Sequence, residues 1–276
     1  MAVERTDWSW VRTVWERTAL YLQQLDQVRA ITLRGIYQTV RNVGLIESMM
    51  ELDRALRQPD SVISERKQQL EAVKADAEIA QQEIDRGYDT INRLATVGLW
   101  AALEAWIEDF MLAWLMNDPS ALSRPEFEKM KMSIAQYESM SREERMSLLV
   151  SELQSATRSS FKPGAAQFET LLEVCGLSGR VESQVQRDLI ELVNVRNVLL
   201  HRASIADSRF VANCPWLSIR SGDQISVRPD DYDRYRNAVF NYLVTVNVRV
   251  RERWLGQDVQ EFPVASPDRH ASTSLG

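Results

Sequence analysis

Three side chains suited to chemistry on a phosphate group, Arg196, Asn197 and His201, lie within one short stretch of the chain. The planar guanidinium of arginine can hold two phosphate oxygens at once, and histidine can accept or release a proton near neutral pH. Side chains at this spacing occupy overlapping sides of a helix end. The stretch therefore predicts a site that binds a phosphate and transfers a proton beside it.

An acidic residue, Glu191, precedes Arg196 and adds to a polar set near the end of an apolar helix. Each member of the set also has a purely structural interpretation. His201 could be stabilised by the dipole at the helix C-terminus. Arg196 could form an ion pair with Glu191 or Asp188, and Asn197 could cap a helix or hydrogen-bond across helices. The sequence leaves these alternatives open.

The pattern Arg196-Asn197-x3-His201 resembles the Arg-x4-6-His signature of HEPN domains, whose nuclease members cut RNA without a metal ion. The tryptophan-containing segment 99–110 resembles the first core helix of these domains. The resemblance covers about residues 88–255. It implies a metal-independent endoribonuclease in a bacterial toxin–antitoxin or antiphage defence setting, and the alternative is a non-catalytic HEPN scaffold that dimerises and binds a partner protein.

By this resemblance Arg196 and His201 correspond to the defining pair, and Asn197 to the polar residue that commonly follows the arginine. Glu191 occupies a position that is frequently acidic. In nuclease members two protomers bring both motifs into one cleft, which implies a homodimer through the helix at about 182–201. Some relatives carry an AMP-accepting tyrosine two positions after the histidine, where this chain has Ala203. The expected partners are RNA, a second copy, and an antitoxin or defence protein.

The composition is that of an ordinary globular protein: 276 residues, 45% hydrophobic and 26% charged, with a net charge of −6. This charge argues against a broad nucleic-acid-binding surface, although one phosphate needs few cations. No stretch approaches the roughly 20 apolar residues of a membrane helix, and the first residues lack the apolar core of a signal peptide. We expect a cytoplasmic protein that does not bind membranes.

Motifs for other chemistries are missing from the sequence, including the phosphate-binding loop, the dinucleotide-binding turn and the His-Glu-x-x-His metal site. Cys175 and Cys214 fit no zinc spacing or disulfide framework, so we expect free thiols and neither metal nor cofactor. Cleavage would then rely on the 2′-hydroxyl of the RNA. Glu104, Glu108 and Asp109 are interpreted as carboxylates at the core edge paired with arginines, with a catalytic support role for Glu104 as the alternative.

The first 86 residues predict an extension of long antiparallel helices. Apolar residues at near-heptad spacing run from Trp8 to Leu56, and Pro59 marks a break. The strongly charged segment 62–86 has sparse apolar positions, which suits a helical hairpin or a short coiled coil.

Residues 87–255 are expected to form a HEPN-like helical domain. Helices are predicted at about 90–117, 164–176 and 182–201, with shorter ones between 118 and 163. Residues 216–227 read as two short strands round Gly222, a small β-hairpin before a last helix that opens at Pro229. Residues 256–276, which include His270, are expected to be a disordered tail. The predicted fold is therefore all-α with one small hairpin and an N-terminal long-helix extension.

Overall fold

The computed structural model describes residues 9–128, 130–131, 133–158 and 164–255, and these residues form helices and connecting segments. The all-α class is thereby confirmed for the described part of the chain, and the tail expected at 256–276 lies outside it. None of the described helices is long and apolar enough to cross a membrane. The helices follow in the order α1 (Ser9–Ala55), α2 (Asp60–Asp85), α3 (Asp89–Asn117), η1 (Ala121–Ser123), α4 (Pro125–Glu128), α5 (Ile134–Ser139), α6 (Arg142–Arg158), α7 (Ala165–Val174), α8 (Ser183–His201), α9 (Ser208–Asn213), α10 (Pro229–Val250) and η2 (Arg251–Leu255).

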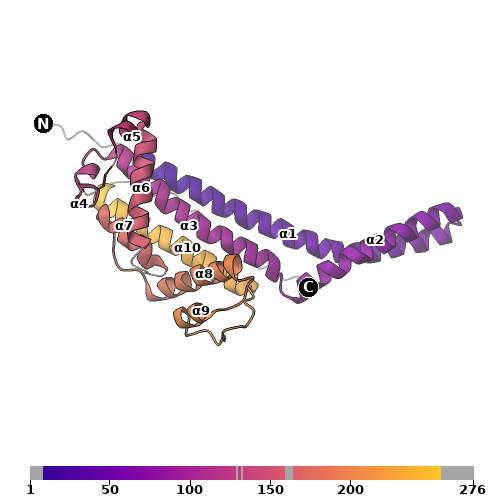
Figure 1. The fold of residues 1–276 in the computed structure, drawn as a ribbon. Coiled ribbons are helices and arrows are strands. Elements are labelled where there is room, and N and C mark those ends of the chain that lie inside the picture. The colour runs from indigo at the N-terminus through magenta and orange to yellow at the C-terminus, as the bar shows by residue number, and fades with distance from the viewer. Residues whose placement is uncertain (1–8, 129, 132, 159–163, 256–276) are drawn as a thin grey trace.

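Helix α1 is one unbroken helix of 47 residues that belongs to two parts of the molecule (Figure 1). Its first part lies along α3 in the body of the protein, where Val11 and Val14 join the main core. Its later part, about residues 33–55, projects with α2 as an arm. A small separate core of Ile46, Met50 and Leu70 joins these two helices. The predicted helical hairpin is present, but it shares α1 with the body.

Helix α3 lies at the centre of the body, and α1, α6, α8 and α10 pack against it. The tryptophans of α3 point to different sides and are all buried: Trp100, Trp106 and Trp114 are at most 2% exposed. Their partners come from different elements, since Trp100 packs on Phe168 of α7 while Trp106 stacks on Phe110 of its own helix. The core is therefore an aromatic cluster gathered round one helix.

The predicted β-hairpin at 216–227 is wrong. The turn at Gly222 is present, with a φ of 97°, but the segments on its two sides do not pair with each other in the described structure. Instead Ile205, in the loop after α8, forms an isolated antiparallel bridge with Gln224. Ile225 N donates to the carbonyl oxygen of Ser204 at 2.7 Å. A strand-like pattern identified the extended segment, but its partner is a distant loop.

Local sequence signals fix several helix ends as expected. Helix α2 begins directly after Pro59, and α10 has Pro229 in its first turn. Before α6, Ser141 N donates to the carboxylate of Glu144 at 2.7 Å, and Glu144 N donates to Ser141 Oγ at 3.2 Å. These two hydrogen bonds form a capping box.

A buried asparagine ties the start of α3 to two other parts of the chain. Asn92 is fully buried. Its Nδ2 donates to the carbonyl oxygens of Gly87 and Val227, each at 3.0 Å, and its Oδ1 accepts from Arg29 Nε of α1 at 2.9 Å. One side chain thus connects α1, α3 and the segment before α10.

We expect Asn92→Ala to lower the free energy of unfolding by about 1–3 kcal/mol, because it leaves buried polar partners unsatisfied. Urea denaturation measures the change. The control is Asn117→Ala at the exposed end of the same helix, which should stay within roughly 0.5 kcal/mol of the unsubstituted protein. Equal losses in the two variants would contradict the role given to Asn92.

Candidate functional site

Helix α8 carries the whole predicted motif and ends at His201. Its first turn is capped by Glu182, whose carboxylate accepts hydrogen bonds from the backbone N–H groups of Gln184 and Val185 at 2.9 and 3.0 Å. One side of α8 is buried against α3 and α10. Arg196 and Asn197 are partly exposed and His201 is exposed. The three motif side chains therefore reach the surface at the C-terminal end of α8.

Arg196 is held by two weak contacts. Its Nη2 lies 3.7 Å from Glu104 Oε2 on α3, and its Nη1 donates to Asn197 Oδ1 at 3.1 Å. The ion-pair partner is thus Glu104, and not Glu191 or Asp188. Since the Arg196 side chain is 27% exposed, this pair contributes at most a few tenths of a kcal/mol. The guanidinium can turn towards another anion at little cost.

The interpretation of the α3 carboxylates as core-edge partners of arginines is confirmed for two of them. Glu104 faces Arg196, and Asp109 accepts from Arg17 of α1 at 2.9 Å. Glu104 is therefore a neighbour of the motif as well as an ion-pair partner, and its carboxylate lies beside the guanidinium of Arg196.

His201 does not meet Arg196 within one chain. Five helical residues correspond to a rotation of about 140° and a rise of about 7.5 Å. Within the described residues, no hydrogen bond or ion pair connects the imidazole to Arg196 or Asn197. The structure brings Arg196 and Asn197 together and leaves His201 at the other edge of the exposed face.

A strained turn directly after His201 fixes where α8 stops. Ala203 and Ser204 have φ values of 49° and 68°, a region that non-glycine residues rarely adopt. Ser204 N donates to the carbonyl oxygen of Val198 at 3.0 Å, and Ser204 Oγ accepts from Arg93 Nη1 of α3 at 2.7 Å. Two adjacent strained residues persist only where the surroundings hold them. These contacts anchor the end of the motif helix to α3.

Glu191, the fourth residue predicted for the site, lies inside the protein and is 3% exposed. Its carboxylate accepts from the Arg234 guanidinium and from Tyr235 Oη at 2.6 Å, both on α10. It also accepts from Trp216 Nε1 at 3.0 Å. Burial alone would raise the pKa of Glu191, but these hydrogen bonds outweigh it and lower the pKa below the ordinary glutamate value. This placement favours a structural role for Glu191.

Arg234 and Tyr235 are residues that the sequence reasoning missed. Arg234 also donates to Asp188 at 2.6 Å, so one guanidinium neutralises two buried carboxylates of α8. The available signal was the position of Asp188 and Glu191 on the buried side of α8. Two buried acids need a cation from another element, and Arg234 supplies it.

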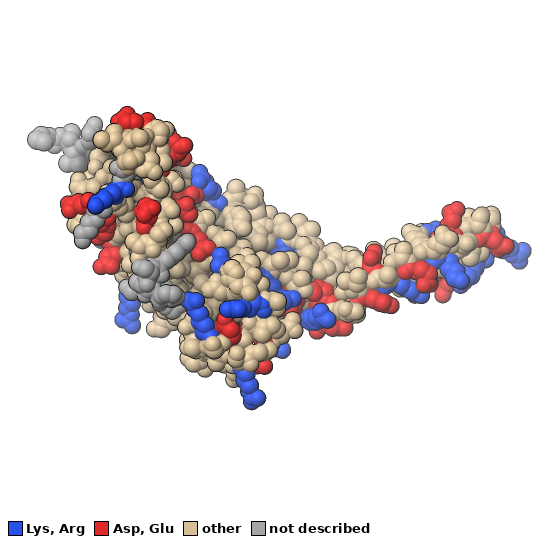
Figure 2. Space-filling view, viewed as in Figure 1, with Lys and Arg blue, Asp and Glu red and all other residues tan. Residues whose placement is uncertain are grey.

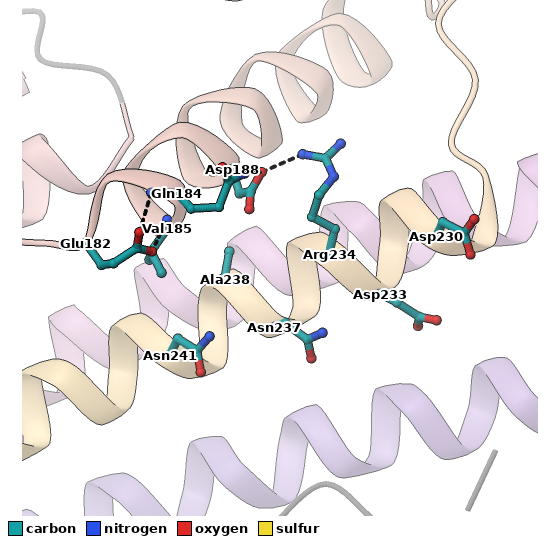
Figure 3. Close-up of a pocket in the computed structure, with 10 residues that line it drawn as sticks. All are labelled: Glu182, Gln184, Val185, Asp188, Asp230, Asp233, Arg234, Asn237, Ala238 and Asn241. Carbon is teal, nitrogen blue, oxygen red and sulfur yellow. Dashed lines mark hydrogen bonds and ion pairs between the residues drawn. The ribbon is translucent and has the colours of Figure 1, made fainter. Parts of the chain in front are cut away.

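A shallow groove of about 380 Å³ lies between the first half of α8 and the first half of α10 (Figure 3). Its charged lining consists of Glu182, Asp188, Asp230, Asp233 and Arg234. Four carboxylates against one guanidinium make it acidic, and Arg234 points to Asp188 rather than into open space. A phosphate would be repelled there. The groove is also roughly 24 Å from the motif end of α8, at 1.5 Å for each residue between Val185 and His201.

Among the described residues, none is placed for metal binding or for chemistry at a thiol. The part of the chain that the structure describes holds no group of three or more His, Cys, Asp or Glu side chains placed to bind a metal ion. Cys175 and Cys214 are free and buried, as predicted. Burial raises the pKa of each thiol to about 12, so both stay protonated and unreactive at neutral pH.

No family model, curated protein or solved structure matches the chain. The candidate site therefore consists of the residues that the fold places at the exposed C-terminal end of α8. They are Arg196, Asn197 and His201, with Glu104 of α3 beside them.

We expect Glu191→Gln to lower the free energy of unfolding by about 3 kcal/mol, because the Arg234 charge loses a buried partner. Urea denaturation at neutral pH gives the value. The matched control is Glu104→Gln, which removes a half-exposed carboxylate of a neighbouring helix and should cost less than about 0.5 kcal/mol. A Glu191→Gln protein as stable as the control would show that the network contributes little.

The lowered pKa of Glu191 also makes this contribution pH-dependent. The stabilisation is complete above the pKa of glutamate in the unfolded chain, about 4.3. It is lost as the pH falls through the lower pKa of the folded protein. The difference in free energy of unfolding between the unsubstituted protein and Glu191→Gln should therefore shrink below pH ~4. A difference that grows on acidification would have the wrong sign.

Proposed function

We propose that the chain is a metal-independent endoribonuclease of the HEPN type, with Arg196, Asn197 and His201 as its reacting groups. The main support is their common position at the exposed end of α8. Arg196 is held there by one long ion pair and one hydrogen bond to Asn197, so it can exchange Glu104 for a phosphate without leaving a buried charge unpaired.

The proposed reaction uses the RNA as its own nucleophile. A neutral His201 accepts the proton of the 2′-hydroxyl, the 2′-oxygen attacks the adjacent phosphorus, and the bond from phosphorus to the 5′-oxygen breaks. The departing oxygen takes a proton from an acid, which leaves a 2′,3′-cyclic phosphate and a free 5′-hydroxyl. Such proton transfer is typically worth 10²–10⁴-fold in rate. Arg196 stabilises the charge that builds on the phosphate oxygens, and Asn197 orients the phosphate.

One histidine cannot act as base and acid in the same step, so the proposal includes a second copy that contributes its own motif. The exposed side of α8 suits such a contact. Leu200 is 50% exposed and lies on the helix face between Arg196 and His201, since it follows Arg196 by about 40°. An apolar side chain flanked by both reacting groups is a natural centre for a symmetric contact between two α8 helices.

RNA cleavage tests the proposal directly. The purified protein should cut single-stranded RNA in the presence of EDTA, leave DNA uncut, and produce 2′,3′-cyclic phosphate ends. Both His201→Ala and Arg196→Ala should lower the rate by at least about 100-fold, the lower limit for an assisted proton transfer. Their thermal unfolding should match that of the unsubstituted protein, since both side chains reach solvent.

The matched control is Arg12→Ala, which removes an exposed arginine paired with Glu16 on α1. It should cut RNA at the normal rate. Cleavage that requires added Mg²⁺, or a His201→Ala protein as active as the control, would contradict the proposed chemistry.

A second candidate is a non-catalytic HEPN scaffold that binds a partner protein. The exposed Leu200 favours it, because a surface leucine beside polar groups also suits protein contacts. Absence of cleavage on every RNA tested, together with loss of partner binding in Leu200→Glu, would favour the scaffold over the nuclease.

A further inference from the structure

The segment that begins at Arg196 and ends at Arg228 is positively charged, although the protein as a whole carries a net charge of −6. It holds five arginines and two aspartates, and neither lysine nor glutamate, so its own net charge is +3. Four of the arginines are exposed, and Arg196 is partly exposed. Figure 2 shows Lys and Arg side chains over α8 and α9, with few acidic side chains among them. A local excess of positive charge on an acidic protein attracts anions to that one place.

Two of these arginines, Arg202 and Arg220, are only weakly neutralised. Arg202 Nε lies 3.6 Å from Asp207 Oδ2, and its side chain is 64% exposed. The same carboxylate already accepts from Phe210 N at 2.8 Å, at the start of α9. Arg220 is exposed, and its guanidinium pairs with no other described residue. The second aspartate, Asp223, instead accepts from the backbone N–H of Arg220 at 2.8 Å. Long, exposed ion pairs contribute little, so both guanidinium groups can bind another anion at little cost.

The backbone places these two arginines beside the motif. Arg202 directly follows the motif histidine, which is the last residue of α8. The turn that carries Arg220 lies against the loop after α8, since Ala206 N donates to the carbonyl oxygen of Asp223 at 2.9 Å and Gly222 N donates to that of Ala206 at 2.8 Å. Both cations therefore belong to one hydrogen-bonded unit next to the exposed end of α8.

We infer that Arg202 and Arg220 bind phosphates of the RNA strand that neighbour the phosphate held by Arg196, and this inference rests on the function proposed above. Each nucleotide of the strand brings one negative charge, and the planar guanidinium can hold two oxygens of a phosphate at once. Contacts to phosphates position a nucleic acid and do not read its sequence. The two arginines thus fix where the strand lies beside the motif, without selecting its sequence.

The rest of α8 directs the strand the same way. The groove beside the first half of this helix is lined by four carboxylates and one arginine, and that arginine is engaged by Asp188 and Glu191. Phosphates are repelled from such a surface. A strand that reaches the motif is therefore directed away from the first half of α8 and towards the loop and turn that carry Arg202 and Arg220.

An RNA that cannot be cut separates this inference from the nuclease chemistry. A short fluorescent RNA with 2′-O-methyl groups keeps every phosphate but lacks the nucleophilic hydroxyl. Its dissociation constant is measured by fluorescence anisotropy between about 50 and 200 mM salt. Each phosphate contact on a single strand contributes about 0.7 to the slope of log affinity against log salt. Arg202→Ala/Arg220→Ala should therefore weaken binding and make the slope shallower by about 1.4, so that this rise in salt costs the variant about sevenfold less affinity than it costs the unsubstituted protein.

Two control proteins isolate the role of local charge. Arg34→Ala/Arg41→Ala removes two exposed arginines of the arm and makes the same change in net charge, so it should keep the slope of the unsubstituted protein. Arg202→Lys/Arg220→Lys retains both charges and should also keep the slope, because lysine binds phosphate as a point charge. Thermal unfolding should be alike in all of these proteins, since every replaced side chain is exposed.

Any of four results would overturn the inference: no salt-dependent binding of the oligonucleotide, an unchanged slope in Arg202→Ala/Arg220→Ala, an equally shallow slope in the arm control, or a lysine variant that loses the slope. The cleavage assay is judged separately. If the protein binds the oligonucleotide with the expected slopes but cuts no RNA, the nuclease proposal fails and the phosphate-binding surface is retained.

Discussion

A helix that is apolar on more than one side can be stable only if other elements cover each of those sides, and α3 imposes this requirement on the body. Its tryptophans point in different directions, so α1, α6, α8 and α10 must each occupy one of its faces. At the N-terminal end of α3, buried polar contacts hold the helix in place. Asp89, in the first turn of α3, accepts from Val227 N at 2.7 Å, and Asn92 holds the neighbouring carbonyls. The position of α8, and with it the motif, follows from the demands of α3.

The sequence was a good guide to helices because their ends depend on local signals. The motif helix was expected at about 182–201 and begins one residue later, and Pro59 and Pro229 mark helix starts. The hairpin failed for the opposite reason. A turn glycine and an alternating pattern identify an extended segment, but they do not identify its partner, and here Gln224 pairs with Ile205 from a distant loop.

In the site too, the features that depend on neighbouring residues could be predicted, and those that depend on contacts between helices could not. Spacing correctly placed Arg196 and Asn197 side by side at a helix end. It could not tell that Glu191 faces inward, because the cation that allows this burial, Arg234, comes from another helix. It also could not bring His201 to Arg196, since helix geometry separates them. The resemblance to HEPN domains therefore remains a prediction, and it depends on a neighbour that one chain does not provide.

Charge is divided along the length of α8. Its first half borders an acidic groove in which Arg234 is fully engaged by carboxylates, while its last turns present Arg196 to the surface. A polyanion approaching a protein of net charge −6 would be repelled from one end of this helix and accepted only at the other. The distribution of charge along α8, and not the net charge of the protein, would therefore determine where an anionic ligand can bind.

The continuity of α1 from body to arm has a mechanical consequence. A helix of 47 residues is about 70 Å long, and α1 has no break between its contacts with α3 and the tip. Any tilt of α1 in the body would therefore be carried along the whole helix to the tip of the arm. A tilt of about five degrees at the α3 contacts would displace the far end by roughly 3 Å over the length of the arm. Small adjustments in core packing would in this way become larger displacements at the tip of the arm.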